Sequence, residues 1–363
     1  MRGLRAVRLG EVRVAAGAQL PLVTATERAR APLPVLDERL RGTKFVSLTA
    51  KSILNAPQQT GMDFWSINPY VGCEFGCTYC YARYAHRYVV ERAHDAGRLT
   101  DEAFRDFRGR EGWEAFERRI FVKQQLVGAL DADLRRYFRS AAPGAPIVIG
   151  TATDPYQPAE RRFRLTRAIL ERLTGFEGLS VGIITKSPLI ARDRDLLRRL
   201  AARSHVEVYV SLITVDAELV RKLEARSPMP AVRLRALRKL TAAGIHAGLI
   251  VAPVLPGVTD DLPHLEAVFA AARDAGARFV HGGPLRLYGA VRDRFLPALV
   301  EHFPHLEARY RRAYTESNAP REYAAALRNR LRKLQARFGF PVNNGMVDRY
   351  RSPRSQAQVD LGL

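Results

Sequence analysis

The chain has 363 residues, which is enough for one large α/β domain with extensions or for two smaller domains. Hydrophobic residues make up 47% of it, but no apolar run approaches the roughly 18 residues that a membrane span requires, and the basic N-terminus lacks the continuous apolar stretch of a signal peptide. The formal net charge of +21 favours phosphate-bearing partners such as nucleic acid, although a GC-rich genome would also produce this excess of arginine.

The first 44 residues are basic and weakly patterned. Pro32 and Pro34 interrupt any regular element there. We therefore expect residues 1–44 to form an arm and not a domain, and residues 45–61 to lead into the region that follows.

All three cysteines of the chain lie within eight residues, at Cys73, Cys77 and Cys80. The preceding residues 66–71 (S-I-N-P-Y-V) are expected to form a strand that enters a glycine-rich turn. Clustered thiolates favour iron–sulfur clusters, zinc or Cu(I), and three of them would leave one iron of a [4Fe–4S] cluster open to a small molecule. The alternative is a zinc site completed by His86, because zinc prefers four ligands. An odd number of closely spaced cysteines argues against a disulfide framework.

Residues 84–113 are expected to be a long polar helical region, and residues 121–134 a further helix. Beyond them short apolar runs alternate with helical patterns, which gives six strands when residues 66–71 are included. The other strands are expected at 146–150, 181–185, 206–212, 247–252 and 278–281. The helices between them are expected at 164–174, 193–202, 216–225, 231–243 and 261–275.

Short apolar strands that alternate with helices predict a parallel sheet covered by helices on both sides. Six such units, with polar and Gly/Pro-rich residues after the strands, predict an α/β fold of the partial (β/α)6 TIM-like barrel type. A doubly wound open sheet is the alternative. The active site of a barrel lies at the C-terminal ends of its strands, and the cysteine stretch follows the first strand, so we expect it at that end.

The last part of the chain is predicted to be helical and then polar. Residues 287–340 are expected to form a helical C-terminal extension, because apolar residues recur at helical spacing within 305–338 and indicate a helical pair that packs on the barrel. Residues 341–363 are expected to be a polar tail.

The segment G-C-E-F-G-C-T-Y-C-Y-A-R, with Tyr79 in the aromatic place of C-x3-C-x-aromatic-C, resembles the signature of the radical SAM superfamily. The resemblance extends over about residues 45–286 and implies a (β/α)6 partial barrel. In that family the three cysteines hold a [4Fe–4S] cluster, S-adenosylmethionine chelates the fourth iron, and an electron from the cluster cleaves the sulfonium to a 5′-deoxyadenosyl radical. A flavodoxin- or ferredoxin-like electron donor is therefore an implied partner. Reduced thiols around such a cluster also fit a cytoplasmic location.

The resemblance implies contacts with the methionine part of the cofactor at the ends of the second and third strands. Thr153 and Asp154, with Glu160 as a weaker candidate, fall where the family binds the amino group. Lys186 is a candidate partner of the carboxylate. An ordinary βα loop and a solvated lysine are the competing interpretations.

The remaining cofactor contacts are implied at later strands. Ser211 corresponds to a position that contacts the ribose hydroxyls. Val251 and Pro253 are candidates for flanking the adenine, and Tyr79 for presenting its backbone to it. Packing of a strand end or of a loop would explain the same residues.

The stretch that begins at Glu224 and includes Arg233 is similar to spore photoproduct lyase-like members, a group also described as DNA repair photolyase-like. This likeness implies a lyase reaction on nucleic acid, and it makes the two residues candidates for an ion pair near the cofactor, or for a surface pair of little energetic weight. Spore photoproduct lyase returns a hydrogen atom from an additional cysteine, which this chain lacks. Tyr81, Tyr84 or Tyr156 would then take that role, with Tyr81 the weak candidate for a catalytic residue, or the reaction differs.

Two functions without radical chemistry stay open from the sequence. One is a non-catalytic protein in which a metal site stabilises the fold of a basic nucleic-acid-binding surface. The other is an electron-transfer protein, although such proteins usually close all four iron positions with protein ligands.

Overall fold

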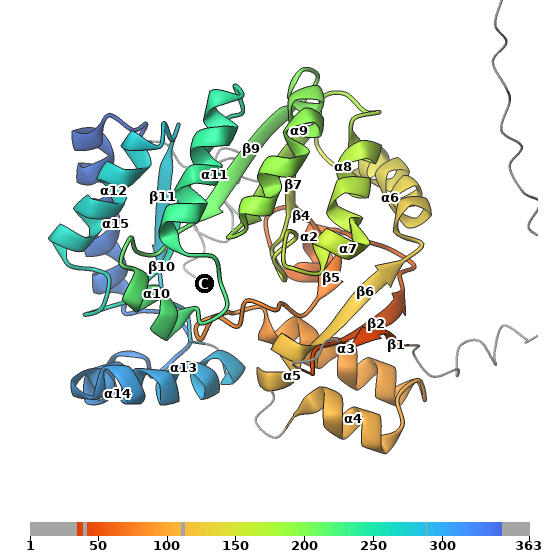
Figure 1. Cartoon of the computed structure of the whole chain (residues 1–363), viewed down its shortest axis with the longest axis horizontal. Coiled ribbons are helices and arrows are strands. Elements are labelled where there is room, and N and C mark those ends of the chain that lie inside the picture. The colour runs from red at the N-terminus through yellow and green to blue at the C-terminus, as the bar shows by residue number, and fades with distance from the viewer. Residues whose placement is uncertain (1–34, 39–41, 110–112, 288, 343–363) are drawn as a thin grey trace, which may run out of the picture.

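The computed structural model describes residues 35–38, 42–109, 113–287 and 289–342. Within them the chain forms two β-sheets surrounded by helices (Figure 1). Residues 1–34 of the predicted arm and residues 343–363 of the predicted tail lie outside the described residues.

The larger sheet has seven strands in the order β11-β10-β9-β8-β7-β4-β3. Neighbouring strands from β4 to β11 run parallel, whereas β3 (Leu54–Asn55) pairs antiparallel with β4. The six parallel strands are β4 (Trp65–Ile67), β7 (Pro146–Ile149), β8 (Ser180–Thr185), β9 (His205–Ser211), β10 (Ala247–Val254) and β11 (Val280–Pro284). In the described part of the chain no pairing joins the two ends of this sheet, so the six predicted strands form a partial barrel.

Helices connect successive parallel strands, as the alternating pattern predicted. These are α7 (Glu160–Phe163) and α8 (Leu165–Leu173) after β7, the 3-10 helix η1 (Pro188–Asp193) and α9 (Arg194–Ala201) after β8, α10 (Ala217–Leu223) and α11 (Pro230–Ala242) after β9, and α12 (Leu262–Asp274) after β10.

The two faces of each parallel strand have different neighbours, because successive side chains of a strand point to opposite sides. On β9 the residues Val206, Val208 and Val210 belong to the hydrophobic core that the helices share. The alternate residue Ser211 at the end of the strand lines a cavity inside the partial barrel. The period of two therefore separates core residues from site residues along one strand.

A second sheet, which the sequence did not predict, has the order β1-β2-β6-β5. Its strands are β1 (Val35–Glu38), β2 (Lys44–Thr49), β5 (Tyr70–Val71) and β6 (Arg119–Gln124). The single strand expected at 66–71 is wrong, because Pro69 lacks an N–H for a ladder bond and the chain turns there from β4 into β5. The helix expected from residue 121 is also wrong in its first turn, because these residues belong to β6. The β-branched residues Ile120 and Val122 favour a strand there.

The predicted polar helical region is divided into α3 (Arg83–Asp95), α4 (Asp101–Arg108) and α5 (Trp113–Arg118). Thr100 begins α4 by accepting a hydrogen bond at its hydroxyl from the Ala103 amide at 3.2 Å. A short α2 (Pro57–Thr60) precedes β4, and α6 (Leu126–Ser140) precedes β7.

The C-terminal extension is helical, as predicted. It consists of α13 (Gly289–His302), the 3-10 helix η2 (Pro304–Leu306), α14 (Glu307–Ala313) and α15 (Arg321–Phe338). The buried residues Leu327, Leu331 and Leu334 of α15 join the main core, and this helix packs on β11 and α12 at the edge of the sheet (Figure 1). No helix of the described residues is long and apolar enough to cross a membrane.

Candidate functional site

The three cysteines lie on one buried loop that begins where β5 ends. Hydrogen bonds from the Cys73 amide to Phe116 O and from the Thr78 amide to Leu223 O, both 2.9 Å, fix the loop to α5 and α10. Gly72 begins the loop with φ of 91°, and a Cβ there would lie 2.8 Å from Phe116 O, so only glycine fits. The loop is thus held rigidly from behind.

One wall of a cavity at the C-terminal ends of the parallel strands is formed by this loop. The opposite walls come from the residues that follow β7, from the end of β8 and Lys186 after it, and from residues of β9 and β10 near their C-terminal ends. The lining residues are Cys73, Phe75, Cys77, Tyr79, Cys80, Tyr81, Ala82, Gly150, Thr151, Thr153, Asp154, Ile184, Thr185, Lys186, Ser211, Ile250, Ala252 and Pro253. The structure therefore brings together the predicted site residues at this cavity, except Val251 and the weaker candidate Glu160.

The three thiols share an apolar, buried environment. Burial raises the pKa of Cys73 and Cys80, and it raises that of Cys77 to about 12. The Cys77 Sγ lies 3.6 Å from the Ser227 hydroxyl. Since metal ligation requires thiolates, loading a metal here would release protons.

His86, the proposed fourth ligand of a zinc site, is turned away from the cysteines. Its ring packs against Phe116 and Phe121, and its Nε2 lies 2.8 Å from Arg119 O. Burial lowers the pKa of His86 to about 4, so the ring is neutral. In the described part of the chain no three His, Cys, Asp or Glu side chains are grouped as a single metal ion would need. This geometry does not support the zinc interpretation.

A network of buried polar groups lies at the cavity and behind its wall; we call it the cavity network, and it consists of Tyr79, Lys186, Ser211, Glu224 and Arg233. Tyr79, Lys186 and Ser211 line the cavity, and Glu224 and Arg233 lie behind them. The Lys186 ammonium donates to the Ser211 hydroxyl at 2.7 Å and lies 3.5 Å from Glu224 Oε1. Glu224 also accepts from the Tyr79 hydroxyl and pairs with Arg233, and both side chains of that pair are completely buried. The Glu224–Arg233 pair is therefore not a surface pair.

The charges of the cavity network outweigh the cost of burial. Burial alone would raise the pKa of Glu224, but the positive charges of Lys186 and Arg233 lower it to about 2. Burial alone would lower the pKa of Lys186, and the Glu224 carboxylate raises it instead. One carboxylate thus faces two cations, and Lys186 is the cation that lines the cavity.

Asp154 and Thr153 line the cavity, and both are already engaged in holding the loop after β7. The Asp154 carboxylate accepts hydrogen bonds from the Thr185 hydroxyl and the Lys186 amide, both at 2.7 Å, and from the Tyr156 amide at 2.9 Å. The Thr153 hydroxyl donates to Gly72 O at 2.6 Å. Because a carboxylate has about four acceptor positions, Asp154 keeps capacity for one more donor.

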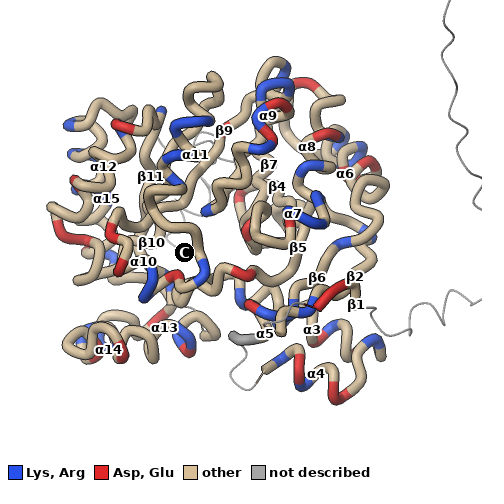
Figure 2. The backbone as a smooth tube through the Cα atoms, in the orientation of Figure 1, with Lys and Arg blue, Asp and Glu red and all other residues tan. Residues whose placement is uncertain are grey.

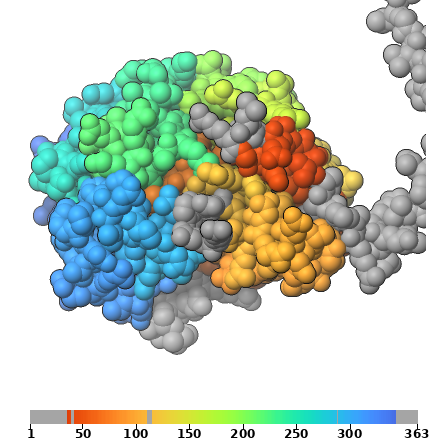
Figure 3. Space-filling model, turned by 60° about the horizontal axis from the view of Figure 1, so that its bottom comes forward, coloured from red at the N-terminus to blue at the C-terminus, as the bar shows by residue number. Residues whose placement is uncertain are grey.

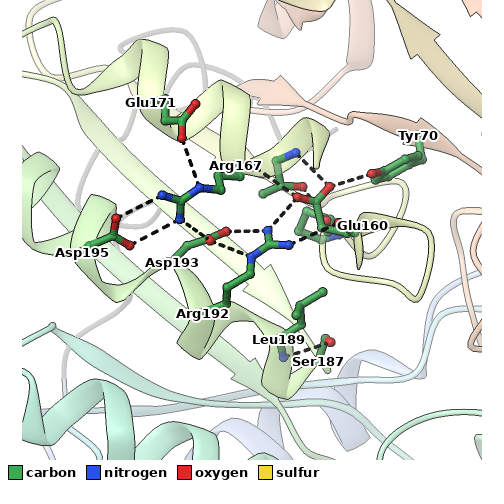
Figure 4. Close-up of polar contacts among 11 residues, drawn as sticks. Tyr70, Glu160, Arg167, Glu171, Ser187, Leu189, Arg192, Asp193 and Asp195 are labelled. Carbon is green, nitrogen blue, oxygen red and sulfur yellow. Dashed lines mark hydrogen bonds and ion pairs between the residues drawn. The ribbon is translucent and has the colours of Figure 1, made fainter. Parts of the chain in front are cut away.

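Glu160, the weaker candidate from the same loop, does not line the cavity. It lies behind the loop in a second network, which we call the rear network and which consists of Tyr70, Glu160, Arg167, Arg192 and Asp193 (Figure 4). Glu160 accepts from the Tyr70 hydroxyl at 2.6 Å and from Arg192 at 3.0 Å, and Asp193 accepts from both arginines at 2.8 Å. The rear network ties β5 to the loops after β7 and β8.

The apolar end of the cavity is formed by Ile184, Ile250, Ala252 and Pro253. Val251 is completely buried in the main core, so its side chain does not reach the cavity. Ile250 and Ala252, on either side of Val251, line the cavity instead, because successive side chains of a strand point to opposite faces.

The three tyrosines considered as hydrogen donors lie in different places. Tyr81 lines the cavity, is 41% exposed and donates its hydroxyl to Thr151 O. Tyr156 is packed in the main core and does not line the cavity, whereas Tyr84 is 49% exposed on α3.

Three residues of the site were missed from the sequence because their role depends on contacts between distant segments. Gln157 donates to Gly72 O at 3.1 Å and accepts from the Glu74 amide at 3.0 Å, which joins the β7 loop to the cysteine loop. Asn68 accepts from the Ala152 amide at 2.7 Å, and Ser227 contacts Cys77. No spacing pattern marks them.

Comparison with known families gives a match to the profile described as the Radical SAM superfamily over residues 67–267. Uncharacterized proteins of Mycobacterium tuberculosis and Mycobacterium bovis are 34% identical over 300 residues, which covers 82% of this chain and 82% of each relative. An uncharacterized protein of Methanocaldococcus jannaschii is 27% identical over 217 residues, covering 60% of this chain and 70% of the relative.

Among solved structures, spore photoproduct lyase complexed with a dinucleoside spore photoproduct superposes with a TM-score of 0.59 and 14% identity, covering 89% of this chain and 86% of that chain. A mutant of spore photoproduct lyase with bound AdoMet and dinucleoside spore photoproduct gives a TM-score of 0.57 and 14% identity, covering 92% of this chain and 86% of that chain. At this level of identity the likeness shows a shared fold.

Proposed function

Because the chain belongs to the radical SAM superfamily, whose members use a [4Fe–4S] cluster and S-adenosylmethionine, we propose that Cys73, Cys77 and Cys80 hold the cluster and that the adjoining cavity holds S-adenosylmethionine. The observation that carries the proposal is the placement of three thiols on one wall of a cavity whose opposite wall offers an ammonium, a hydroxyl and a carboxylate.

The residues of the cavity fit both groups. Three soft thiolates suit iron, and the count leaves one iron without a protein sulfur. The polar residues Lys186 and Asp154 have charges opposite to those of an amino acid's carboxylate and ammonium. When bound, the cluster and S-adenosylmethionine supply a 5′-deoxyadenosyl radical by one-electron cleavage of the sulfonium.

Each part of the cavity has a distinct task in this proposal. Lys186 attracts the methionine carboxylate, and Asp154 accepts a hydrogen bond from the methionine ammonium through its remaining acceptor capacity. Ser211, which accepts from Lys186, is placed to donate to the ribose. Ile250 and Pro253 flank the adenine, and the buried walls exclude water from the reacting atoms.

We propose nucleic acid as the substrate class, with the net charge of +21 as support. Fold likeness to spore photoproduct lyase agrees with this proposal, while the absence of a fourth cysteine argues for a different hydrogen return or a different reaction. Among Tyr81, Tyr84 and Tyr156, Tyr81 is the candidate for that role, because of these three it lines the cavity together with the cysteines and has a hydroxyl near the loop after β7. The division into an arm, a barrel at 45–286, an extension and a tail, and a cytoplasmic location, also remain proposals.

The test of the proposed function is anaerobic reconstitution with iron and sulfide, followed by S-adenosylmethionine and dithionite. We expect 5′-deoxyadenosine from the wild-type protein and none from a variant in which Cys73, Cys77 and Cys80 are all replaced by serine. A fully loaded wild-type protein that yields no 5′-deoxyadenosine would contradict the proposal and favour a metal-stapled binding protein.

A further inference from the structure

A groove of about 790 Å³ lies outside the cavity, between α3, α4 and α13. We call it the α3 groove. Its lining includes four arginines, Arg83, Arg87, Arg105 and Arg108, against the two carboxylates of Glu91 and Asp293. Val90, Phe104, Phe107 and Pro297 give it an apolar floor. The groove is therefore a positively charged surface with an apolar centre, as protein-binding sites often are.

Exposed tyrosines are concentrated beside this groove. Tyr81, Tyr84 and Tyr88 are 41%, 49% and 57% exposed; Tyr84 and Tyr88 lie four residues apart on one face of α3, and Tyr81 lies in the turn before it. Every other tyrosine in the described part of the chain is buried or half-buried. These three line a small hollow that shares Arg87 and Glu91 with the α3 groove. Tyrosine and arginine are the residue types that most often anchor protein–protein interfaces.

A single side chain, that of Arg83, connects the α3 groove to the cysteine loop. The Arg83 guanidinium, part of the groove lining, donates to Cys77 O at 2.8 Å and to Glu117 at 2.8 Å. Residues 72–79 of the cysteine loop are buried, whereas Cys80 is half-buried and Tyr81 is exposed. The loop thus approaches the surface where α3 begins, next to the groove (Figure 1).

The positive charge of the groove lining comes from arginine. Figure 2 shows basic residues on α3 and α4, and Figure 3 shows the face that these helices (orange to yellow) share with α13 and α14 (blue). On α4 the exposed residues Arg105 and Arg108 lie in the last turn, whereas the exposed carboxylates Asp101 and Glu102 lie in the first turn. Asp106 pairs with Arg119 and Lys44, and Asp101 pairs with His94.

We propose that an acidic one-electron carrier protein of the flavodoxin or ferredoxin kind docks on the α3 groove and reduces the cluster through the cysteine loop. The inference rests on the proposed function, since it requires a cluster at Cys73, Cys77 and Cys80. Electron transfer slows steeply with distance, so a donor needs the surface where the loop comes nearest to solvent.

The redox step balances with the carrier as the only co-reactant. A flavodoxin hydroquinone gives up one electron and becomes the semiquinone, its proton passes to solvent, and the [4Fe–4S] cluster takes up the electron and changes from the 2+ to the 1+ state. The positive charge of Arg83, whose guanidinium donates to Cys77 O, favours the more negative, reduced state.

The experiment compares cluster reduction by two donors in the reconstituted protein without S-adenosylmethionine. One donor is an acidic flavodoxin reduced by light and deazaflavin, and the other is dithionite. The variant is R105E/R108E, whose side chains are both exposed on α4, and the matched control is R194E/R198E, which reverses two exposed arginines on α9. The loss of cluster absorbance, followed in a stopped-flow instrument, gives the rate of cluster reduction. The readout is the rate with flavodoxin divided by the rate with dithionite.

We expect the flavodoxin-to-dithionite ratio to fall about tenfold or more for R105E/R108E at low ionic strength and to approach the wild-type ratio as salt is added, because reversing rim charges mainly slows association. The control should keep the wild-type ratio within about twofold, since its charges are not on the docking face. An unchanged ratio for R105E/R108E would overturn the inference, and so would an equal fall in both variants, which would indicate a general charge effect.

Two further outcomes separate this inference from its alternatives. If R105E/R108E weakens binding of a single-stranded DNA oligonucleotide and leaves the ratio unchanged, the groove is a nucleic-acid surface and the inference is wrong. If the cluster is reduced normally by both donors but S-adenosylmethionine is never cleaved, the proposed function fails while the docking result stands, because cluster reduction is measured without S-adenosylmethionine.

Discussion

The cavity network and the rear network are both buried sets of carboxylates, cations and a tyrosine, yet their charges are balanced differently. In the rear network the carboxylates of Glu160 and Asp193 are matched by two arginines, and Arg167 also pairs with Glu171 and Asp195 outside the set (Figure 4). In the cavity network Glu224 alone faces Lys186 and Arg233.

The difference distinguishes a structural network from a binding one. A buried ion pair contributes little net stability but costs much when one partner is removed. A balanced set therefore holds loops in place and needs no ligand. A set with one surplus cation at a cavity wall is suited to an anionic group from outside, such as a carboxylate, which would complete its charge. Four substitutions test this distinction, in order of the expected size of their effect.

Removal of the only carboxylate of the cavity network should have the largest effect. We expect Glu224→Gln to lower the free energy of unfolding by about 3–5 kcal/mol at neutral pH, because Arg233 and Lys186 would be buried without a counter-charge. Urea unfolding at pH 7 measures this.

The pH dependence of that difference follows from the pKa of Glu224, which is about 2 in the folded protein and 4.5 in its ordinary state. A lowered folded pKa contributes stability that is complete above pH 4.5 and is lost as pH falls from 4.5 to 2. The gap between wild type and Glu224→Gln should therefore shrink over this interval. A gap of constant size would show that Glu224 is not ionised in the folded protein.

The rear network should respond in stability and not in ligand binding. Arg192→Met would leave Glu160 and Asp193 each with fewer partners, and we expect a loss of about 3 kcal/mol with affinity for S-adenosylmethionine kept within about threefold once the variant is folded and loaded. Arg194→Met, exposed on the neighbouring helix, is the control and should change little. If the loss of binding free energy for S-adenosylmethionine exceeded the loss of unfolding free energy, the rear network would also act in binding, and the distinction between the two networks would be wrong.

Lys186→Met should show the opposite pattern. The surplus cation disappears while Glu224 keeps Arg233, so we expect roughly a 10- to 100-fold weaker affinity for S-adenosylmethionine, as for one lost charge-assisted hydrogen bond, and a smaller loss of stability than Arg192→Met causes. Iron and sulfide content should match the wild type, and Lys222→Met on the exposed side of α10 is the control. Equal affinities of Lys186→Met and wild type would remove Lys186 from the binding site.

The smallest expected effect is that of Ser211→Ala, which removes one neutral hydrogen bond to Lys186. We expect affinity for S-adenosylmethionine to fall about fivefold, near 1 kcal/mol. Equilibrium binding to the loaded protein checks this. A loss as large as that of Lys186→Met would mean that the hydroxyl positions the ammonium and does not merely accept from it.

The sequence predicted the parts of the molecule that depend on local patterns. Apolar runs alternating with helical periodicity gave the six parallel strands, and the polar residues after them gave Asp154, Lys186 and Ser211 at one cavity. Where two adjacent residues compete, as at Val251 and its neighbours, the choice depends on the phase of a strand's alternation, which a short apolar run does not fix.

The parts that were missed depend on contacts between distant segments. The second sheet pairs β2 with β6, more than 70 residues apart, and neither segment has a strong pattern of its own. The rear network was missed for the same reason: Glu160 has the residue type of a ligand-binding carboxylate, and only its contact with Tyr70, 90 residues earlier, shows that it faces away from the cavity.

The most direct test is a titration of the reconstituted, dithionite-reduced protein with S-adenosylmethionine, monitored by the electron paramagnetic resonance of the cluster. Coordination of the methionine amino and carboxylate groups to an iron without a cysteine ligand predicts a saturable change of the spectrum, and hyperfine coupling from 15N-labelled methionine in the bound cofactor. An identical spectrum with and without millimolar S-adenosylmethionine, in a protein with full iron and sulfide content, would contradict the assignment of this cavity.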